Sequence, residues 1–461
     1  MFPTPEEKQR AQKTDENYAL FRGKWGEVLR YFRTYKERRN TLEVVENLAG
    51  DITRVFADLM FLKPPKVTID DPALSERIAD FFERSRLSQV LHESALTQSY
   101  NGRTTFEMRL DEGLAIVEEL DPATVFPHYK NSSFRGEPVD VVISWEPKID
   151  GKKYRFLKTH TVGQIRYQLL NIDDGGKAQG TAPLSLFDPD LMEIEETGLD
   201  YIPVYFIDNQ KTGRDMFGIS DYDDLRLMFE EISRTLSQAA TQFKKNATAK
   251  MAVPPGVIDD KGQVISGNDE FFEIPASDGE KQIIPSYITN NNALMEWLLK
   301  WADDITMRIL RTAEVADVLI GLNTSRGAEA PGALALRIMR TLAKVQRKLW
   351  AYNAMLKEMI IDAMIWEKSG TVISAKNISL TFSNGLPEDR LQNAQIQSTR
   401  YTAGLQSLKD AIRDLDGLEG DALDAKVEEI NSEHKAAAPV TSPFAPFAPI
   451  GTKTPVTALN K

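Results

Sequence analysis

The chain has 461 residues, enough for roughly two to four domains of about 100–200 residues each. It contains no cysteine, which excludes a disulfide framework, a thiolate zinc site and a cysteine nucleophile. Its formal net charge of −12 disfavours a repressor or a DNA-storage protein, because such proteins use excess Lys and Arg to displace counterions from phosphates. An acidic surface is still compatible with DNA that slides past it.

The N-terminal part is predicted to be helical after a short polar start. Residues 1–17 are polar, lack the apolar core of a secretory signal, and are expected to be disordered. From Tyr18 onward, apolar residues recur on one helical face opposite a basic face. Such a helix can bind nucleic acid, but an amphipathic helix with a solvated basic face is the preferred interpretation. Further helices are predicted over 41–60 and 73–99, with Pro64 and Pro65 ending the first of them.

A β-rich region follows Gly102. Alternating apolar residues bounded by turn residues predict strands at 103–110, 114–120, 139–145, 153–160 and 163–170. The stretch 171–190 is rich in Gly, Asp and Pro and is predicted to be a loop. A further strand is predicted from Ile202 to Ile207.

Long helices dominate the second half. A helix is predicted over 220–249, with Ser220 as its N-cap and Asp223 completing a variant of the capping box. Gly and Pro turns indicate a compact module of short strands over 251–290. The helical pattern then resumes near residue 293, breaks at 319–332 and continues over 333–368.

The C-terminal part is predicted to contain a strand at 376–383 and helices at about 388–415 and 421–433. The final Ala/Pro/Thr-rich segment, 435–461, is expected to be disordered. No apolar run approaches the ~18 residues of a membrane span. These elements place the chain in the α+β class.

Signatures of catalysis are missing from the sequence. It has no phosphate-binding G-x-x-x-x-G-K-[ST] or G-x-G-x-x-G motif and no G-x-S-x-G nucleophile turn. Adjacent carboxylates such as Asp223 and Asp224 point apart on regular elements and cannot share a proton. The histidines show no metal-binding spacing: His92, His128, His160 and His434. The sequence therefore predicts no catalytic residue, no metal site and no cofactor.

Three segments, in this order and spacing, resemble the portal protein family of tailed bacteriophages. The first runs from Asn47 through Ala57-Asp58-Leu59 to Pro64-Pro65-Lys66-Val67. The second and strongest is Gly218-Ile219-Ser220-Asp221-Tyr222-Asp223-Asp224-Leu225, preceded by Ile202-Pro203-Val204. The third is Pro331-Gly332-Ala333-Leu334 with its following helix, then Leu380-Thr381-Phe382-Ser383-Asn384 and Leu386-Pro387. The resemblance covers about residues 18–430.

This resemblance implies a portal fold and a ring, usually of twelve subunits, at the unique capsid vertex of the virion. The ring would be the channel for DNA packaging and ejection. The segments would then be a disordered N-terminus (1–17), the wing (18–218), the first stem helix (219–250), the clip (251–291), the second stem helix (292–318), the tunnel loop (319–332), the long wing helix with its return strand (333–386), the crown helices (387–434) and a disordered tail (435–461).

Three candidate sites follow from this assignment. The tunnel loop would contact DNA through Asn323, Thr324, Ser325 and Arg326. Lysines near the far end of the first stem helix would form a basic belt in the channel: Lys244, Lys245 and Lys250. The clip would bind terminase and later the adaptor protein through exposed acids: Asp259, Asp260, Asp269 and Glu270. The simpler alternatives are a plain helix-to-helix turn, ordinary surface lysines and a connecting insertion.

The expected partners are other copies of the chain, the terminase large subunit, the major capsid and scaffolding proteins, a head-completion or adaptor protein, and double-stranded DNA bound without sequence specificity. No membrane partner is expected, and the location would be the virion after assembly in the host cytoplasm. Two other functions stay open from the sequence. One is a different phage ring-forming connector, although those are typically much shorter. The other is a cytosolic α+β enzyme whose site is assembled from distant residues.

Overall fold

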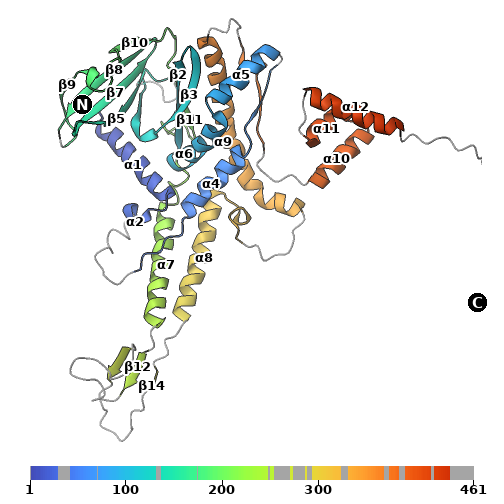
Figure 1. The fold of residues 1–461 in the computed structure, drawn as a ribbon. Coiled ribbons are helices and arrows are strands. Elements are labelled where there is room, and N and C mark those ends of the chain that lie inside the picture. Colours follow the sequence, from blue (N-terminus) through green and yellow to red (C-terminus); the bar gives the residue numbers. More distant parts are fainter. Residues whose placement is uncertain are drawn as a thin grey trace, which may run out of the picture. The chain divides into compact units, whose positions relative to one another are not determined.

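The computed structural model describes residues 2–29, 42–69, 71–130, 137–173, 175–247, 250–253, 270–273, 286–287, 293–322, 331–367, 373–383, 390–416 and 420–436. The chain divides into two compact units, residues 1–385 and 386–461. The first unit combines helices with mainly antiparallel sheets, and the second is helical where it is described (Figure 1). The α+β class predicted from the sequence agrees with this content.

The N-terminal segment is helical rather than disordered, so this part of the prediction was wrong. Helix α1 (Pro5–Phe21) begins with a capping box, in which the Thr4 hydroxyl accepts from the Glu7 amide and the Glu7 carboxylate accepts from the Thr4 amide. The helix predicted to start at Tyr18 instead ends at Phe21. After Gly23, which has a φ of +75°, the short helix α2 (Trp25–Val28) begins.

Three helices lead from this start to the sheets. Helix α4 (Leu48–Phe61) begins later than predicted, because the Asn47 side chain caps it by accepting from the Gly50 amide. The helix predicted over 73–99 is two helices, α5 (Pro72–Arg84) and α6 (Leu87–Asn101). Arg86 adopts a left-handed φ of 48° between them, and the preceding Ser85 hydroxyl accepts from the Val117 amide of the sheet. The break between α5 and α6 therefore coincides with a contact to the sheet, and the apolar pattern of the sequence does not reveal it.

The predicted strands form two sheets in the first unit (Figure 1). One has the order β11-β2-β3, from β11 (Val204–Asp208), β2 (Arg103–Asp111) and β3 (Leu114–Leu120). The other has the order β10-β8-β7-β5-β4, with β6 beside β7 and β9 beside β8; its strands are β4 (Val125–His128), β5 (Asp140–Trp145), β6 (Lys148–Ile149), β7 (Lys152–Thr161), β8 (Gln164–Ile172), β9 (Ala178–Ala182) and β10 (Ile194–Glu196). Short 3₁₀ turns lie at Pro122–Thr124 and Leu184–Leu186. The predicted loop 171–190 thus contains a strand.

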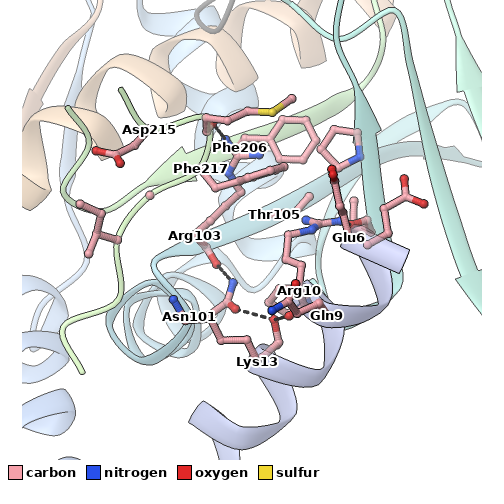
Figure 2. A pocket seen from close by; sticks show the side chains of 18 of the residues that line it. Glu6, Gln9, Arg10, Lys13, Asn101, Arg103, Thr105, Phe206, Asp215 and Phe217 are labelled. Carbon is pink, nitrogen blue, oxygen red and sulfur yellow. Dashed lines mark hydrogen bonds between the residues drawn. The ribbon is translucent and has the colours of Figure 1, made fainter. Parts of the chain in front are cut away.

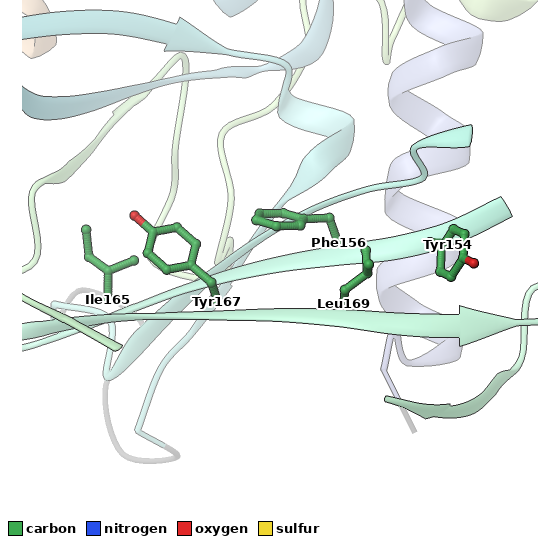
Figure 3. Close-up of a cluster of buried hydrophobic side chains, with 5 residues drawn as sticks. All are labelled: Tyr154, Phe156, Ile165, Tyr167 and Leu169. Atoms are coloured by element: carbon green, nitrogen blue, oxygen red, sulfur yellow. The ribbon is translucent and has the colours of Figure 1, made fainter. Parts of the chain in front are cut away.

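Alternation along β7 and β8 builds the core of the larger sheet. Tyr154 and Phe156 alternate along β7, and three residues alternate along β8, so all lie on one face and pack together (Figure 3): Ile165, Tyr167 and Leu169. Their cluster explains why the period-two pattern in the sequence located these strands correctly.

Strand β3 carries a buried carboxyl group that makes stability depend on pH. Burial raises the pKa of Glu119 to about 7, against the opposing hydrogen bonds of Thr97 and Thr104. Because the folded-state pKa lies above the ordinary value of 4.5, the neutral form stabilises the fold at low pH and this contribution is lost as pH rises through about 7. Wild type loses stability between pH 5 and pH 8, whereas Glu119→Gln has no carboxyl group to ionise at this position. We therefore expect the free energy of unfolding of Glu119→Gln, relative to that of wild type, to rise by about 2–3 kcal/mol from pH 5 to pH 8.

Urea unfolding of both proteins at the two pH values measures this gain. Glu118→Gln is the matched control, since the neighbouring Glu118 carboxylate is exposed and pairs with Arg109. A Glu119→Gln variant whose stability follows that of wild type at both pH values would contradict the prediction.

Long helices follow the sheets. Helices α7 (Arg226–Ala247) and α8 (Ala293–Ala313) pack side by side, and α9 (Pro331–Trp366) packs against α4 and strand β11 (Figure 1). Between α7 and α8, strand β12 (Lys250–Val253) pairs in parallel with β13 (Glu270–Glu273) and antiparallel with β14 (Ser286–Tyr287). The predicted N-cap was wrong: α7 starts at Arg226, and the Ser220 hydroxyl accepts from the Tyr222 amide in a preceding turn.

The return strand closes the first unit. Strand β15 (Ser379–Thr381) pairs antiparallel with β1 (Lys66–Thr68) after a 3₁₀ turn at Ala375–Asn377. The second unit contains α10 (Arg390–Thr402), α11 (Leu408–Asp416) and α12 (Gly420–Ala436), so the helix predicted over 388–415 is broken after Thr402. The predicted C-terminal tail lies outside the described residues, except that α12 extends to Ala436.

Candidate functional site

The structure describes only some of the residues that were predicted to form the basic belt and to bind partners at the clip. Lys244 is exposed near the end of α7, and Lys245 follows it in the same helix. Lys250 starts strand β12, where its backbone partner in the parallel register is Glu270 at the start of β13. The structure therefore pairs one predicted belt residue with one predicted clip residue. The other predicted site residues lie outside the described part of the chain: Asp259, Asp260, Asp269, Asn323, Thr324, Ser325 and Arg326.

Hydrogen bonds and an ion pair join the segment before the predicted tunnel loop to helix α9. Helix α8 ends at Ala313, and Glu314 follows with a left-handed φ of 62°. The Thr341 hydroxyl donates to the Glu314 carbonyl at 2.8 Å and accepts from the Ala316 amide at 3.0 Å. Arg347 of α9 pairs with the Glu314 carboxylate at 2.9 Å.

A second ion pair extends this contact toward the loop. Arg337 pairs with Asp317 at 2.9 Å, in the 3₁₀ turn Asp317–Ile320 that precedes Gly321. Sequence reasoning missed these contacts, since each joins residues more than fifteen positions apart. They hold the end of α8 against α9 on both sides of the predicted loop.

The α7–α8 pair exposes aromatic side chains on α8, on the same side of the helix as its buried isoleucines. Ile305 and Ile309 of α8 are buried. In the N-terminal half of α8 the apolar side chains are exposed, Trp297 to 70% and Trp301 to 45%. Leu294 of α8 and Phe243 of α7 are exposed as well. Large apolar patches on a single chain indicate a contact surface for another protein.

The segment of strongest family resemblance forms a buried charge cluster. The Asp221 carboxylate contacts the ammonium groups of Lys344 at 2.9 Å and Lys348 at 2.8 Å, both from α9. Burial alone raises the pKa of Asp221, but the two lysines outweigh it and hold that pKa well below its usual range. Burial lowers the pKa of Lys348 to about 8, although Asp221 opposes this effect.

The backbone beside this cluster admits no side chain. A Cβ at Gly218 would lie 1.9 Å from the carbonyl oxygen of Gly102, which itself has a φ of +90°. The side-chain Nδ2 of Asn209 also donates to the Asp221 carboxylate at 3.1 Å. Gly218 and Asp221 thus belong to the junction that joins α6, strand β11 and α9 ahead of the first long helix.

The described residues hold no group of His, Asp or Glu side chains arranged to bind a metal ion. His92 contacts Asp58, and His128 lies between Glu7 and Asp140. No helix among the described residues is long and apolar enough to cross a membrane.

A comparison with known protein families shows to which family the chain belongs. The family model described as "Phage portal protein, SPP1 Gp6-like" matches residues 4–440, nearly the whole chain. The chain belongs to this portal protein family. Portal proteins of this family are structural, and the match agrees with the resemblance that the three sequence segments indicated.

Solved structures similar to this portal chain come from particles of a gene transfer agent (GTA). A chain of "Neck of empty GTA particle computed with C6 symmetry" has a TM-score of 0.45 and 14% identity, covering 81% of this chain and 90% of that one. A chain of "Virion of native gene transfer agent (GTA) particle" has a TM-score of 0.42 and 14% identity, covering 80% and 89%. No curated protein matches the sequence.

Proposed function

We propose that this portal chain forms a dodecameric ring at the unique vertex of a phage capsid and that DNA passes through the ring during packaging and ejection. The observation that carries the proposal is the family match over residues 4–440. The protein would act as a structural part of the virion and not as an enzyme. In this role it needs no cofactor, since the motor that moves DNA is a separate terminase.

The exposed aromatic residues of α7 and α8 support assembly. An isolated chain leaves most of Trp297 and nearly half of Trp301 exposed to water, and a neighbouring subunit would cover both side chains. A contact between unlike surfaces of successive copies closes into a ring when its rotation divides a full turn. Helices α7 and α8 would accordingly be the stem of each subunit, packed against the stems of its neighbours.

Charge supports passage rather than storage of DNA. Each subunit has a formal net charge of −12, so a ring of subunits would repel phosphates over most of its surface. Lys244, Lys245 and Lys250 would add a basic belt near the end of the stem, which contacts the DNA backbone without reading its sequence. Strands β12, β13 and β14 would belong to the clip, where terminase and later the adaptor protein dock.

The tunnel loop gives a direct test of channel function. We expect deletion of residues 323–330 to leave rings intact, because the contacts of Glu314, Thr341 and Arg347 hold the flanking helices together without it. DNA packaging or retention should fall at least about tenfold if the loop contacts the DNA. Electron microscopy of the rings and a nuclease-protection assay of packaged DNA measure the two effects. Rings of this variant that package and retain DNA normally would show that the loop is only a connector.

Negative-stain electron microscopy of the purified full chain tests the proposed assembly. Particles with a central hole and twelvefold symmetry are expected. A preparation of monomers at micromolar concentration, or a closed particle without a hole, would contradict the proposal.

A further inference from the structure

A cleft of about 990 Å³ lies between helix α1 and the sheets, and its lining includes none of the predicted site residues. Its walls come from α1, strands β2, β4 and β11, and the segment 214–219. Figure 2 shows Arg10 of α1 across the cleft from Arg103 of β2, with the rings of Phe206 and Phe217 beside them. None of the functions proposed above uses this cleft.

Arg10 contributes a partly buried guanidinium group that has few partners. It donates one hydrogen bond, to the Val125 carbonyl at 2.8 Å, and it lies 4.7 Å from the centre of the Phe217 ring and 5.4 Å from that of Phe126. Among the described residues, no carboxylate lies within ion-pair distance of it. Burial and the nearby Arg103 lower its pKa to about 10, although Glu7 opposes this effect. The group therefore stays charged at neutral pH and retains N–H donors for a ligand.

Apart from Arg214, which is exposed, the other Lys and Arg residues that line the cleft already have acidic partners. Arg103 binds Asp208 through two hydrogen bonds, of 2.5 and 3.0 Å. Lys13 pairs with Asp223 and Arg226 pairs with Glu16, both at 2.9 Å. The contrast singles out Arg10 as a cation for which the fold supplies aromatic faces but no acid. A planar guanidinium group binds a carboxylate through two parallel hydrogen bonds.

We propose that this cleft binds an acidic segment of another protein, with an Asp or Glu carboxylate of that segment on Arg10 and an adjacent apolar side chain against Phe206 and Phe217. The cleft has the size of the largest pockets for small ligands and is open to solvent, which suits a short stretch of chain. Gln9 and Gln12 of α1 line it and offer both donors and acceptors to a peptide backbone. Arg103 already lies over both rings, and an inorganic anion would add no apolar contact to them, whereas an apolar side chain beside the carboxylate would.

Saturation-transfer difference NMR of the full-length protein tests this proposal, since it detects weak ligands of large assemblies. The probe is an acetylated and amidated peptide of sequence Gly-Glu-Phe-Gly, compared with its Gly-Gln-Phe-Gly counterpart. We expect the Glu peptide to bind wild-type protein about tenfold more tightly than the Gln peptide, because a charged hydrogen-bond pair is lost in the second. The Phe ring should receive the strongest saturation.

Substitutions locate the binding to the cleft. Arg10→Gln should weaken the Glu peptide about tenfold, and Arg10→Lys should restore part of that loss, because it keeps the charge but not the planar fork. Arg308→Gln is the control, since Arg308 is exposed on α8 and pairs with Asp304 of the same helix. Thermal unfolding of each variant shows whether the fold is retained.

Three results would overturn the proposal. They are equal binding of the Glu and Gln peptides, undiminished binding to a folded Arg10→Gln protein, and complete displacement of the Glu peptide by inorganic phosphate at equal concentration. The third would indicate a simple anion site. None of the three bears on ring formation, which microscopy measures separately, so the portal proposal can stand if this one fails.

Discussion

Replacing Asp221 by asparagine is expected to lower the free energy of unfolding by about 3–5 kcal/mol. The substitution removes a carboxylate that contacts both Lys344 and Lys348, two lysines that are as buried as residues of the core. Each lysine keeps one neutral acceptor, the Ala313 carbonyl for Lys344 and the Asn209 side chain for Lys348. Two adjacent buried positive charges then repel each other without compensation.

The neighbouring Asp223 supplies a matched control for this effect. It also forms an ion pair, with Lys13, but that lysine side chain is about half exposed. Asp223→Asn should therefore cost about 0–1 kcal/mol. Chemical denaturation of both variants, followed by circular dichroism, measures the difference. Equal stability losses for the two substitutions would show that the buried cluster contributes no more than a surface pair.

A lysine substitution distinguishes charge balance from packing. Lys348→Met leaves Asp221 with Lys344 as its partner and removes one of two like charges, so it should cost less than Asp221→Asn. If Lys348→Met loses less free energy of unfolding than Asp221→Asn, the effect of Asp221→Asn comes from uncompensated charge. A larger loss for Lys348→Met would instead assign the cluster's contribution to the other contacts of the Lys348 ammonium group, which are the Asn209 side chain at 2.6 Å and the Phe56 ring at 5.1 Å.

The second large effect is expected on assembly. Replacing Trp297 and Trp301 together by glutamine should convert rings into monomers while leaving each subunit folded. Both side chains are substantially exposed in the single chain, so their loss removes little from the core, apart from the hydrogen bond of Trp301 to Glu231 at 3.1 Å. In a ring they would be covered at every interface, where each buried aromatic side chain contributes several kcal/mol, at about 25 cal/mol per Å².

Light scattering and negative-stain microscopy measure the loss of rings, and circular dichroism checks the fold. Asp304→Asn is the control, because Asp304 lies on the same helix, is exposed and contacts Arg308 within α8. It should form rings like wild type. A double tryptophan variant that still forms wild-type rings would place the subunit interface elsewhere on the chain.

The comparison of sequence with structure shows where local pattern is sufficient. Strands β2, β3, β7 and β8 were located to within two residues, because apolar residues alternate along them. The long helices were found because their apolar residues recur every three to four positions, which is the period of a helix. Helix α1 was missed because it buries polar residues such as Thr14 and Asn17, although the Thr4-Pro5-Glu6-Glu7 capping box was visible in the sequence.

Site prediction succeeded less well, and for a different reason. The predicted DNA and clip contacts were assigned through the resemblance, and most lie outside the described residues. The Asp221 cluster lies inside the strongest family segment, yet nothing local distinguishes Asp221 from Asp223 or Asp224. Only the approach of α9, more than a hundred residues later, makes the first of these a buried partner of two lysines.

The sequence by itself determined the class of fold, the position of most strands and long helices, and the portal family, because these depend on periodic burial and on ordered local segments. The tertiary structure alone decided which charges are buried, which apolar residues stay exposed and where Arg10 meets the aromatic rings of a cleft. Those properties arise when residues distant in the chain come together and exclude water, since a charge or an apolar side chain changes its free energy only with its surroundings.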